Sequence, residues 1–149
     1  MRYVISALLG SMLFVANAAQ ANECELMITG NDSMRFDKKE MSVPASCEEV
    51  TVTLTHSGKL GEKVMGHNWV LSKASDMQSI VQKGMSAGME NEYVPETDTV
   101  IAATDVIGGG EKTSVTFSTE GMSADTDYKF YCTFPGHSAI MQGNFVIKE

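Results

Sequence analysis

Four side chains that can hold a soft metal ion occur in two places in the sequence. Cys132, His137 and Met141 form a Cys-x4-His-x3-Met segment, and a further histidine, His67, lies far upstream. One thiolate, two imidazoles and a distant thioether form the ligand set of blue copper sites, in which methionine is a weak axial ligand. The spacing therefore predicts a copper site that only the folded chain completes, because His67 must come from a separate segment.

This ligand set suits a metal that gains and loses one electron. Cu(I) favours soft sulfur ligands and low coordination numbers, whereas Cu(II) favours nitrogen ligands and higher coordination numbers. A thiolate, two imidazoles and a weak fourth ligand lie between these demands. The pair Pro135-Gly136 inside the ligand segment predicts a tight turn, which would fix the ligands relative to one another. We expect one copper ion per chain.

Each of these residues has another explanation when it is taken alone. Met141 could pack in the core, and His67 beside Trp69 could be an ordinary histidine of a strand. Cys132 could be a disulfide partner or a nucleophile, but no third orienting residue is evident. A zinc site would more often use several Cys or His ligands and no Met. The joint pattern favours copper, and His56 is expected to lie outside the ligand set, where it could titrate near neutral pH and affect the reduction potential.

The beginning of the chain predicts export. A short positive start and an apolar run over residues 3–16 precede Ala19-Gln20-Ala21, a small-x-small cleavage pattern. We expect residues 1–21 to be a secretory signal peptide that is cleaved before Asn22, and residues 22–149 to form one domain in the periplasm. The other interpretation is an uncleaved amino-terminal anchor. The apolar run is short for a bilayer span, and cleavage would remove it. We therefore expect no membrane span after cleavage.

Composition limits the partners and the redox state. The formal net charge is −8 at pH 7, and the sequence contains no cluster of Lys and Arg. Nucleic acid is therefore a poor partner, because phosphate binding needs a basic face. Three cysteines, Cys24, Cys47 and Cys132, allow one disulfide in an exported chain and leave one thiol over. Metal binding would explain that remaining thiol.

The rest of the chain must position these ligands, and it is typical of short strands separated by turns. The predicted strands cover residues 25–30, 50–55, 67–71, 100–103, 112–118, 128–133 and 143–148. Short strands of this kind indicate an all-β sandwich or barrel. Residues 75–89 instead carry apolar side chains at helical spacing, and Ser75 with Gln78 resembles a capping box. We expect one short helix attached to the sandwich.

The segments around the ligands resemble the azurins, a family within the cupredoxins. The likeness covers essentially all of residues 22–149. The matching segments are Asn22-Glu23-Cys24, Gly30-Asn31-Asp32, residues 64–72 and residues 131–141. The resemblance implies an eight-stranded Greek-key sandwich with one helical insertion.

The resemblance also implies roles for particular residues. It implies a very weak fifth copper contact from the backbone carbonyl of Gly66, and a hydrogen bond from Asn68 near the thiolate. Such outer donors stabilise the thiolate and tune the potential. It further implies a disulfide between Cys24 and Cys47 and a buried Trp69.

The function expected from the site and the resemblance is that of an electron carrier and not of an enzyme. Azurins pass electrons between c-type cytochromes and periplasmic oxidoreductases such as nitrite reductases or amine dehydrogenases, and we expect a monomer with similar partners. Two other hypotheses are a copper chaperone or buffer, and an adhesion-like sandwich that binds no metal.

Electrons are expected to pass through His137, at an exposed apolar patch that contains Met65 and Phe134. The small or turn-forming neighbours of His137 should leave the edge of its ring uncovered.

Overall fold

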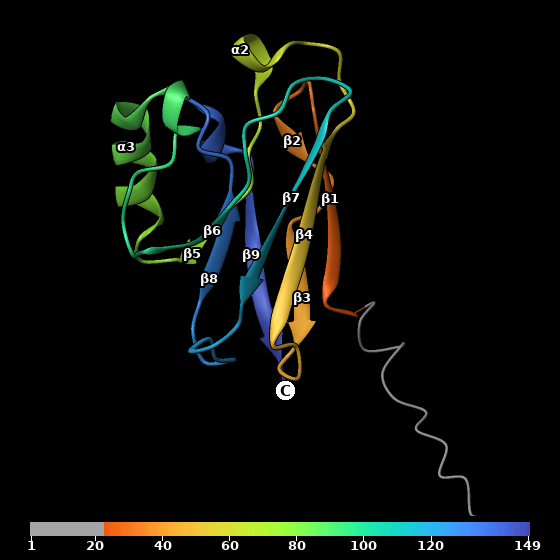
Figure 1. Cartoon of the computed structure of the whole chain (residues 1–149), viewed down its shortest axis with the longest axis vertical. Coiled ribbons are helices and arrows are strands. Elements are labelled where there is room, and N and C mark those ends of the chain that lie inside the picture. The colour runs from red at the N-terminus through yellow and green to blue at the C-terminus, as the bar shows by residue number, and fades with distance from the viewer. Residues whose placement is uncertain (1–22) are drawn as a thin grey trace, which may run out of the picture.

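The computed structural model describes residues 23–149 as two β-sheets packed face to face (Figure 1). One sheet has the strand order β2-β1-β4-β7, and the other has the order β3-β9-β8-β5-β6. The predicted all-β sandwich is confirmed. The expected signal peptide and its cleavage site lie outside the described residues and stay predictions.

Nine strands lie in the described range, and eight of them have four or more residues. The strands are β1 (Glu25–Asn31), β2 (Arg35–Phe36), β3 (Glu40–Pro44), β4 (Glu49–His56), β5 (Val70–Lys73), β6 (Val100–Ala103), β7 (Lys112–Ser118), β8 (Tyr128–Tyr131) and β9 (Gln142–Lys148). The sequence pattern missed β2, which is two residues long, and β3, which buries only Met41 and Val43. The strand predicted over residues 67–71 begins too early, because His67 forms only an isolated bridge with Ile107.

The strand directions bring the connections β4–β5, β6–β7 and β8–β9 to one end of the sandwich, where β1 also ends. β1 runs parallel to β4, and β3 runs parallel to β9, so the chain crosses repeatedly between the two sheets in a Greek-key manner. β1, β4, β6 and β8 end at this end, where β5, β7 and β9 begin. Figure 1 shows this end at the top, with α2 (Glu62–Met65) above it. All the segments that carry predicted ligands therefore meet there.

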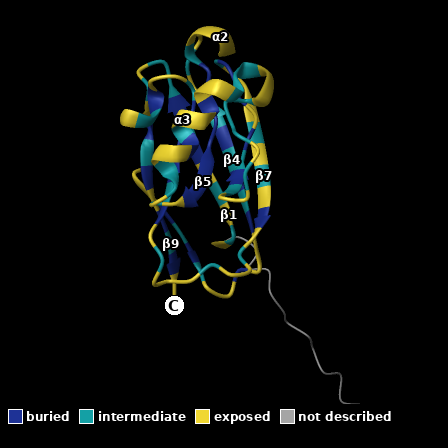
Figure 2. Ribbon diagram, turned by 90° about the vertical axis from the view of Figure 1, so that its left-hand side faces the viewer, coloured by how far each residue is buried: buried dark blue, intermediate teal, exposed yellow. Residues whose placement is uncertain are grey.

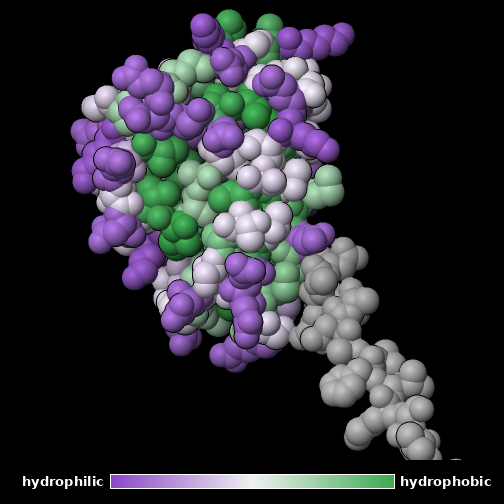
Figure 3. All heavy atoms as spheres, in the orientation of Figure 1, coloured by the Kyte–Doolittle hydropathy of each residue, from purple (hydrophilic) through white to green (hydrophobic). Residues whose placement is uncertain are grey.

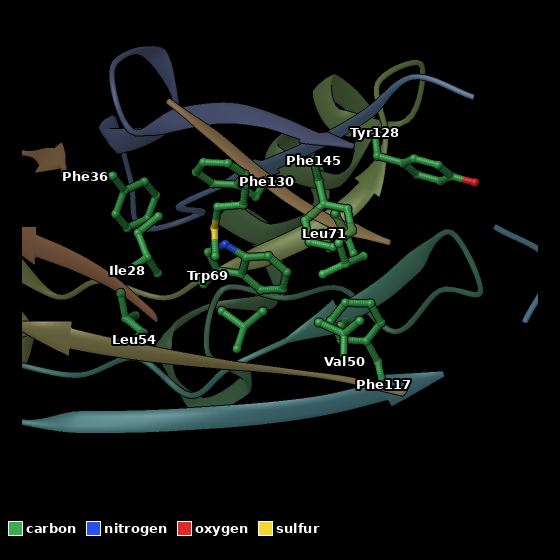
Figure 4. Packing of buried hydrophobic residues seen from close by; sticks show 14 of the residues in the cluster. Ile28, Phe36, Val50, Leu54, Trp69, Leu71, Phe117, Tyr128, Phe130 and Phe145 are labelled. Atoms are coloured by element: carbon green, nitrogen blue, oxygen red, sulfur yellow. The ribbon is translucent and has the colours of Figure 1, made fainter. Parts of the chain in front are cut away.

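The core between the sheets is built around Trp69, which is completely buried. Its ring packs against Phe117, Phe130 and Phe145 at centroid distances of 6.1 to 6.2 Å (Figure 4). The indole Nε1 has no hydrogen-bond partner among the described residues, which costs about 1–3 kcal/mol. Burial of so large an apolar ring more than offsets this cost. The ring is therefore held by packing, while the backbone of Trp69 exchanges hydrogen bonds with Thr104.

The predicted helix is confirmed as α3 (Met77–Ala87), which lies against the outer side of the five-stranded sheet. It buries Ile80 against Val70 and Tyr131, and its outer face is exposed (Figure 2). The predicted capping box is wrong: Asp76 occupies the N-cap position and makes no side-chain cap hydrogen bond. The helix begins later than Ser75 would require.

The disulfide between Cys24 and Cys47 is present, and Cys132 is free and buried. The bond closes a loop of 23 residues between the start of β1 and the approach to β4. Closure of such a loop stabilises a protein by about 3 kcal/mol in the chain-entropy model. Within the described range, no helix has the length and apolar character needed to cross a membrane.

Candidate metal centre

Three predicted ligands converge at the end of the sandwich where the connections β4–β5, β6–β7 and β8–β9 meet. The ligand atoms of His67, Cys132 and His137 all lie within 4.8 Å of one another. The two Nδ1 atoms are 3.3 Å apart, and the Sγ of Cys132 lies 3.7 Å from the Nδ1 of His137. Donors that surround a metal at about 2 Å lie about 3.5 Å from each other. The three side chains therefore have the spacing of a metal-binding set.

Each ligand sits at or just beyond the end of a strand. Cys132 directly follows β8, and Met141 directly precedes β9. The backbone N–H of Cys132 donates to the carbonyl of Met141, which closes the loop between the two strands. His67 reaches the centre from the opposite connection, where its bridge with Ile107 fixes it two residues before Trp69. The site thus depends on the pairing of separate parts of the fold.

The loop from Cys132 to Met141 contains the tight turn that Pro135-Gly136 predicts. The backbone N–H of His137 donates to the carbonyl of Phe134, and Gly136 has φ +83° and ψ −13°. These values match the third position of a type II turn, which favours glycine because φ is positive. The turn leads into η2 (His137–Ala139), and the N–H of Met141 donates back to the carbonyl of His137. Backbone hydrogen bonds therefore fix the ligands without any help from a metal.

The two imidazoles face each other through their Nδ1 atoms. The Nε2 of His67 donates to the carbonyl of Asn31 at 2.8 Å, which leaves its Nδ1 as an acceptor. The Nδ1 of His137 faces both this nitrogen and the thiol, and in the metal-free protein its N–H can donate to the Nδ1 of His67. A cation between the two nitrogens would take the place of that proton. This arrangement fits a metal ion.

Burial is the main cause of the pKa shifts at the three donors. It lowers the pKa of His137 to about 4, with repulsion from His67 as a further cause, and it lowers the pKa of His67 as well. It raises the pKa of the Cys132 thiol to about 12, although backbone N–H groups of Asn68 and Phe134 act in the opposite direction. Without metal at neutral pH, the centre therefore holds a thiol and neutral imidazoles. Metal binding must displace the thiol proton.

The donor set selects the kind of metal. Met141 is completely buried, and backbone hydrogen bonds link it to Cys132 and His137. The carbonyl of Gly66 lies 4.0 Å from the Sγ of Cys132. A Cβ at Gly66 would collide with Val106 and Phe134, so this close approach of the backbone requires glycine. A thiolate, two imidazoles and a thioether fit copper better than zinc.

Asn68 links the segment of His67 to the ligand loop. Its Oδ1 accepts a hydrogen bond from the backbone N–H of Thr133 at 2.8 Å, and its Nδ2 donates to the Oγ1 of the same residue at 2.7 Å. Thr133 directly follows Cys132, so Asn68 fixes the backbone next to the sulfur. The role of Asn68 toward the thiolate itself stays a prediction.

His56 lies next to the centre but outside the converging group. Its ring stacks on the ring of His67 with centroids 4.3 Å apart. Its Nδ1 accepts a hydrogen bond from the N–H of Gly58, so its Nε2 donates to the carbonyl of Met65. The sequence did not indicate this stacking, because 11 positions separate the two histidines and no period relates them.

The prediction that the ring edge of His137 is uncovered is wrong. His137 has an exposed fraction of only 3%, because the ring of Phe134 packs on it at a centroid distance of 4.7 Å. Phe134 and Met65 are themselves half-buried. Apolar surface does occur at this end, where Val64 is 65% exposed and Ile140 is 42% exposed. In Figure 3, apolar atoms reach the top of the molecule, where Figure 1 places α2.

Two sheets packed around an apolar core, with a buried centre of two histidines and one cysteine at one end, define a β-sandwich metal-binding protein. A sequence model of the copper-binding proteins of the plastocyanin/azurin family matches residues 22–148. The chain therefore belongs to the plastocyanin/azurin family.

Individual relatives agree with this assignment. The chain is 56% identical to Azurin-1 of Alcaligenes xylosoxydans xylosoxydans over 122 residues, which cover 81% of this chain and 95% of that protein. It is 49% identical to azurin of Pseudomonas aeruginosa, over 86% of this chain and 87% of the relative. An azurin structure (Az-iso2) from Methylomonas sp. strain J superimposes with a TM-score of 0.81 at 43% identity, over 85% of this chain and 98% of the other.

The pKa shifts predict how the stability of the metal-free protein depends on pH. We expect a maximum between about pH 6.5 and 9.0, the ordinary pKa values of His and Cys. Below it, the unfolded chain binds protons at His67 and His137 that the folded protein binds only at lower pH, about 4 for His137, so the free energy of unfolding falls. Above it, the unfolded chain loses the Cys132 proton that the folded protein keeps, so stability falls again. Urea unfolding across this pH range measures both limbs.

A Cys132→Ser variant is the matched control for the alkaline limb. It should keep the loss of stability toward pH 4 and lose the decline between pH 9.0 and 10.0, because serine does not titrate there. Above pH 10.0 both proteins should lose stability, because burial raises the pKa of Tyr131 to about 12. A free energy of unfolding that stays constant between pH 4 and 6.5 in the metal-free protein would contradict the burial of neutral imidazoles.

Proposed function

We propose that this protein is a periplasmic carrier of single electrons that holds one copper ion. His67, Cys132 and His137 would be the main ligands, with Met141 as a weak axial ligand and the Gly66 carbonyl as a very weak one. Copper supplies the exchange of one electron between Cu(I) and Cu(II). The observation that carries the proposal is the convergence of the three donors within 4.8 Å, inside a fold of the plastocyanin/azurin family.

Burial of the centre favours a carrier over an enzyme or a copper chaperone. His67, Cys132 and Met141 are completely buried, and His137 is almost so. A substrate would need an open coordination position, which a site closed by Met141 and Gly66 does not offer. A protein that passes copper to partners would need accessible ligands. A carrier needs only that the electron can reach the surface, and fixed ligands keep rearrangement small.

The proposed compartment is supported by the disulfide and by the pattern at the start of the sequence. Residues 1–21 have the pattern of a signal peptide, and the Cys24–Cys47 disulfide is typical of an oxidising compartment. The partners we propose are c-type cytochromes and periplasmic oxidoreductases of the nitrite reductase or amine dehydrogenase type, met by a monomer. The net charge of −8 makes nucleic acid a poor partner, because phosphate binding needs a basic face.

Loading the metal-free protein with copper tests the proposal directly. We expect an intense blue colour from charge transfer between the Cys132 thiolate and Cu(II), and a reversible one-electron titration. Cys132→Ser should lose the intense colour, because a hydroxyl group is not a soft, readily oxidised donor. Absorption spectra of the copper-loaded wild type and of the Cys132→Ser variant measure this difference in colour. A variant that stayed intensely blue would exclude Cys132 as the ligand, and a copper-loaded protein without a one-electron wave would exclude the carrier.

The axial role of Met141 has its own test. We expect Met141→Leu to keep copper and colour but to have a higher reduction potential, because loss of a thioether donor and added apolar bulk favour Cu(I). Voltammetry of the two proteins measures the shift. An unchanged or lower potential would place the Met141 thioether outside the coordination sphere.

An apolar rim around the ligand loop is the proposed docking surface. It consists of Leu60, Val64, Met65, Phe134 and Ile140. Because the ring of Phe134 packs on the ring of His137, a partner that covers Phe134 would approach the ligand closely. Small apolar contacts allow weak and short-lived binding, as redox encounters require.

A charge on the rim should slow electron transfer without changing the centre. We expect Met65→Lys to reduce electron self-exchange and transfer to a cytochrome by about tenfold, because a buried ammonium group would be costly in the docked complex. Its spectrum and potential should change little. Met27→Lys is the matched control, since Met27 is 64% exposed on the outer face of β1. Equal rates for the two variants at matched ionic strength would place the docking surface elsewhere.

A further inference from the structure

The segment that follows α3 reaches the ligand loop by two routes. It runs through η1 (Met89–Asn91) to Glu92 and Tyr93, which have φ values of +55° and +54°. Such values are uncommon for residues other than glycine and cost about 1–3 kcal/mol each. Specific contacts must therefore hold these two residues in place.

Glu92 is held from two sides. Its carboxylate Oε2 accepts a hydrogen bond from the backbone N–H of Val106 at 2.6 Å. Its carbonyl accepts a hydrogen bond from the Nδ2 of Asn68 at 2.8 Å. Because Asn68 also binds both the N–H and the hydroxyl of Thr133, a continuous line of hydrogen bonds runs from Val106 to the residue next to Cys132.

Tyr93 provides the second route. Its ring packs edge-on against Phe134 at a centroid distance of 5.3 Å, and Phe134 packs in turn on His137. The carbonyl of Tyr93 lies so close to Gly84 of α3 that a Cβ there would collide with it. Helix α3 is thus in close contact with Tyr93, which in turn contacts the ligand loop through Phe134.

We propose that Glu92 is a positioning residue for the metal ligands. Its carboxylate anchors residues 92–93 to Val106, so that its own carbonyl orients Asn68 and the ring of Tyr93 supports Phe134. Asn68 then fixes Thr133 beside Cys132, and Phe134 fixes His137. The ligand loop is held in its metal-binding geometry before the metal enters. The inference rests on the proposed copper site for its functional meaning, but the line of contacts exists in the metal-free protein.

The role of the carboxylate as a hydrogen-bond acceptor can be separated from its role as a charge. Glu92→Gln keeps an oxygen that accepts from Val106 and removes the charge. Glu92→Ala and Glu92→Gly remove the acceptor, and glycine tolerates the positive φ, so a folded variant is available even if alanine is too strained. Glu90→Ala is the control, since Glu90 is exposed in the same short helix.

The first measurement uses metal-free protein. Hydrogen exchange at the Thr133 amide, relative to the core amide of Val52 in β4, should be about tenfold faster in Glu92→Gly and Glu92→Ala than in the wild type. Glu92→Gln and Glu90→Ala should resemble the wild type. Unchanged exchange at Thr133 in the glycine variant would overturn the proposal, and so would a glutamine variant that behaves like the glycine variant.

The second measurement uses copper-loaded protein. Removal of copper by a chelator should be about ten- to a hundredfold faster without the acceptor, the usual effect of losing an outer partner of a metal ligand. Glutamine should restore slow removal. Equal removal rates in Glu92→Gly and the wild type would overturn the positioning role. If the wild type bound no copper, the copper proposal would fail, while the exchange measurement would still decide whether Glu92 holds the loop.

Discussion

The rest of the structure depends on one unfavourable arrangement. The donor groups of two histidines and one cysteine are buried and face one another. The Nδ1 atoms of His67 and His137 lie 3.3 Å apart, and the Cys132 thiol lies 3.7 Å from one of them. Burial keeps all three groups uncharged, as the lowered pKa of the imidazoles and the raised pKa of the thiol indicate. Without a cation, the triangle offers only the contact between the two imidazoles and the longer contact between sulfur and nitrogen. The surrounding structure must supply the free energy that keeps the donors together.

The sandwich supplies it through separate parts of the chain that cannot relax independently. The hydrogen bond from the N–H of Cys132 to the carbonyl of Met141 closes the ligand loop between β8 and β9, and the turn at Gly136 sets its shape. His67 is fixed from the other connection by its bridge to Ile107 and by the carbonyl of Asn31. Ligands that are already in place lose little entropy when a metal binds, and they move little when its charge changes.

The sequence predicted those parts of the structure that depend on local spacing or on residue type. Cys132, His137 and Met141 are close in the chain, and a turn at Pro135-Gly136 has a local cause, so the ligand loop could be predicted. The outer contacts could not be predicted, because Glu92 accepts hydrogen bonds from Val106 and Asn68 in a segment with two non-glycine residues at positive φ, which no periodicity reveals. The strand β3 was missed for a similar reason, since it becomes a strand only by pairing with β9. The covering of His137 was misjudged because its cover, Phe134, is oriented by Tyr93 from a distant segment.

The same contacts explain how a partner could approach a centre that is itself buried. His67 is shielded on one side by the stacked ring of His56, whose own nitrogens are both used by the backbone. His137 packs against Phe134, which is half-buried. Burial excludes water from the donors, which would keep the reorganisation around a changing charge small in the proposed carrier. An apolar cover that is itself part of the proposed docking surface would be a structural compromise between a dry site and a short path for an electron.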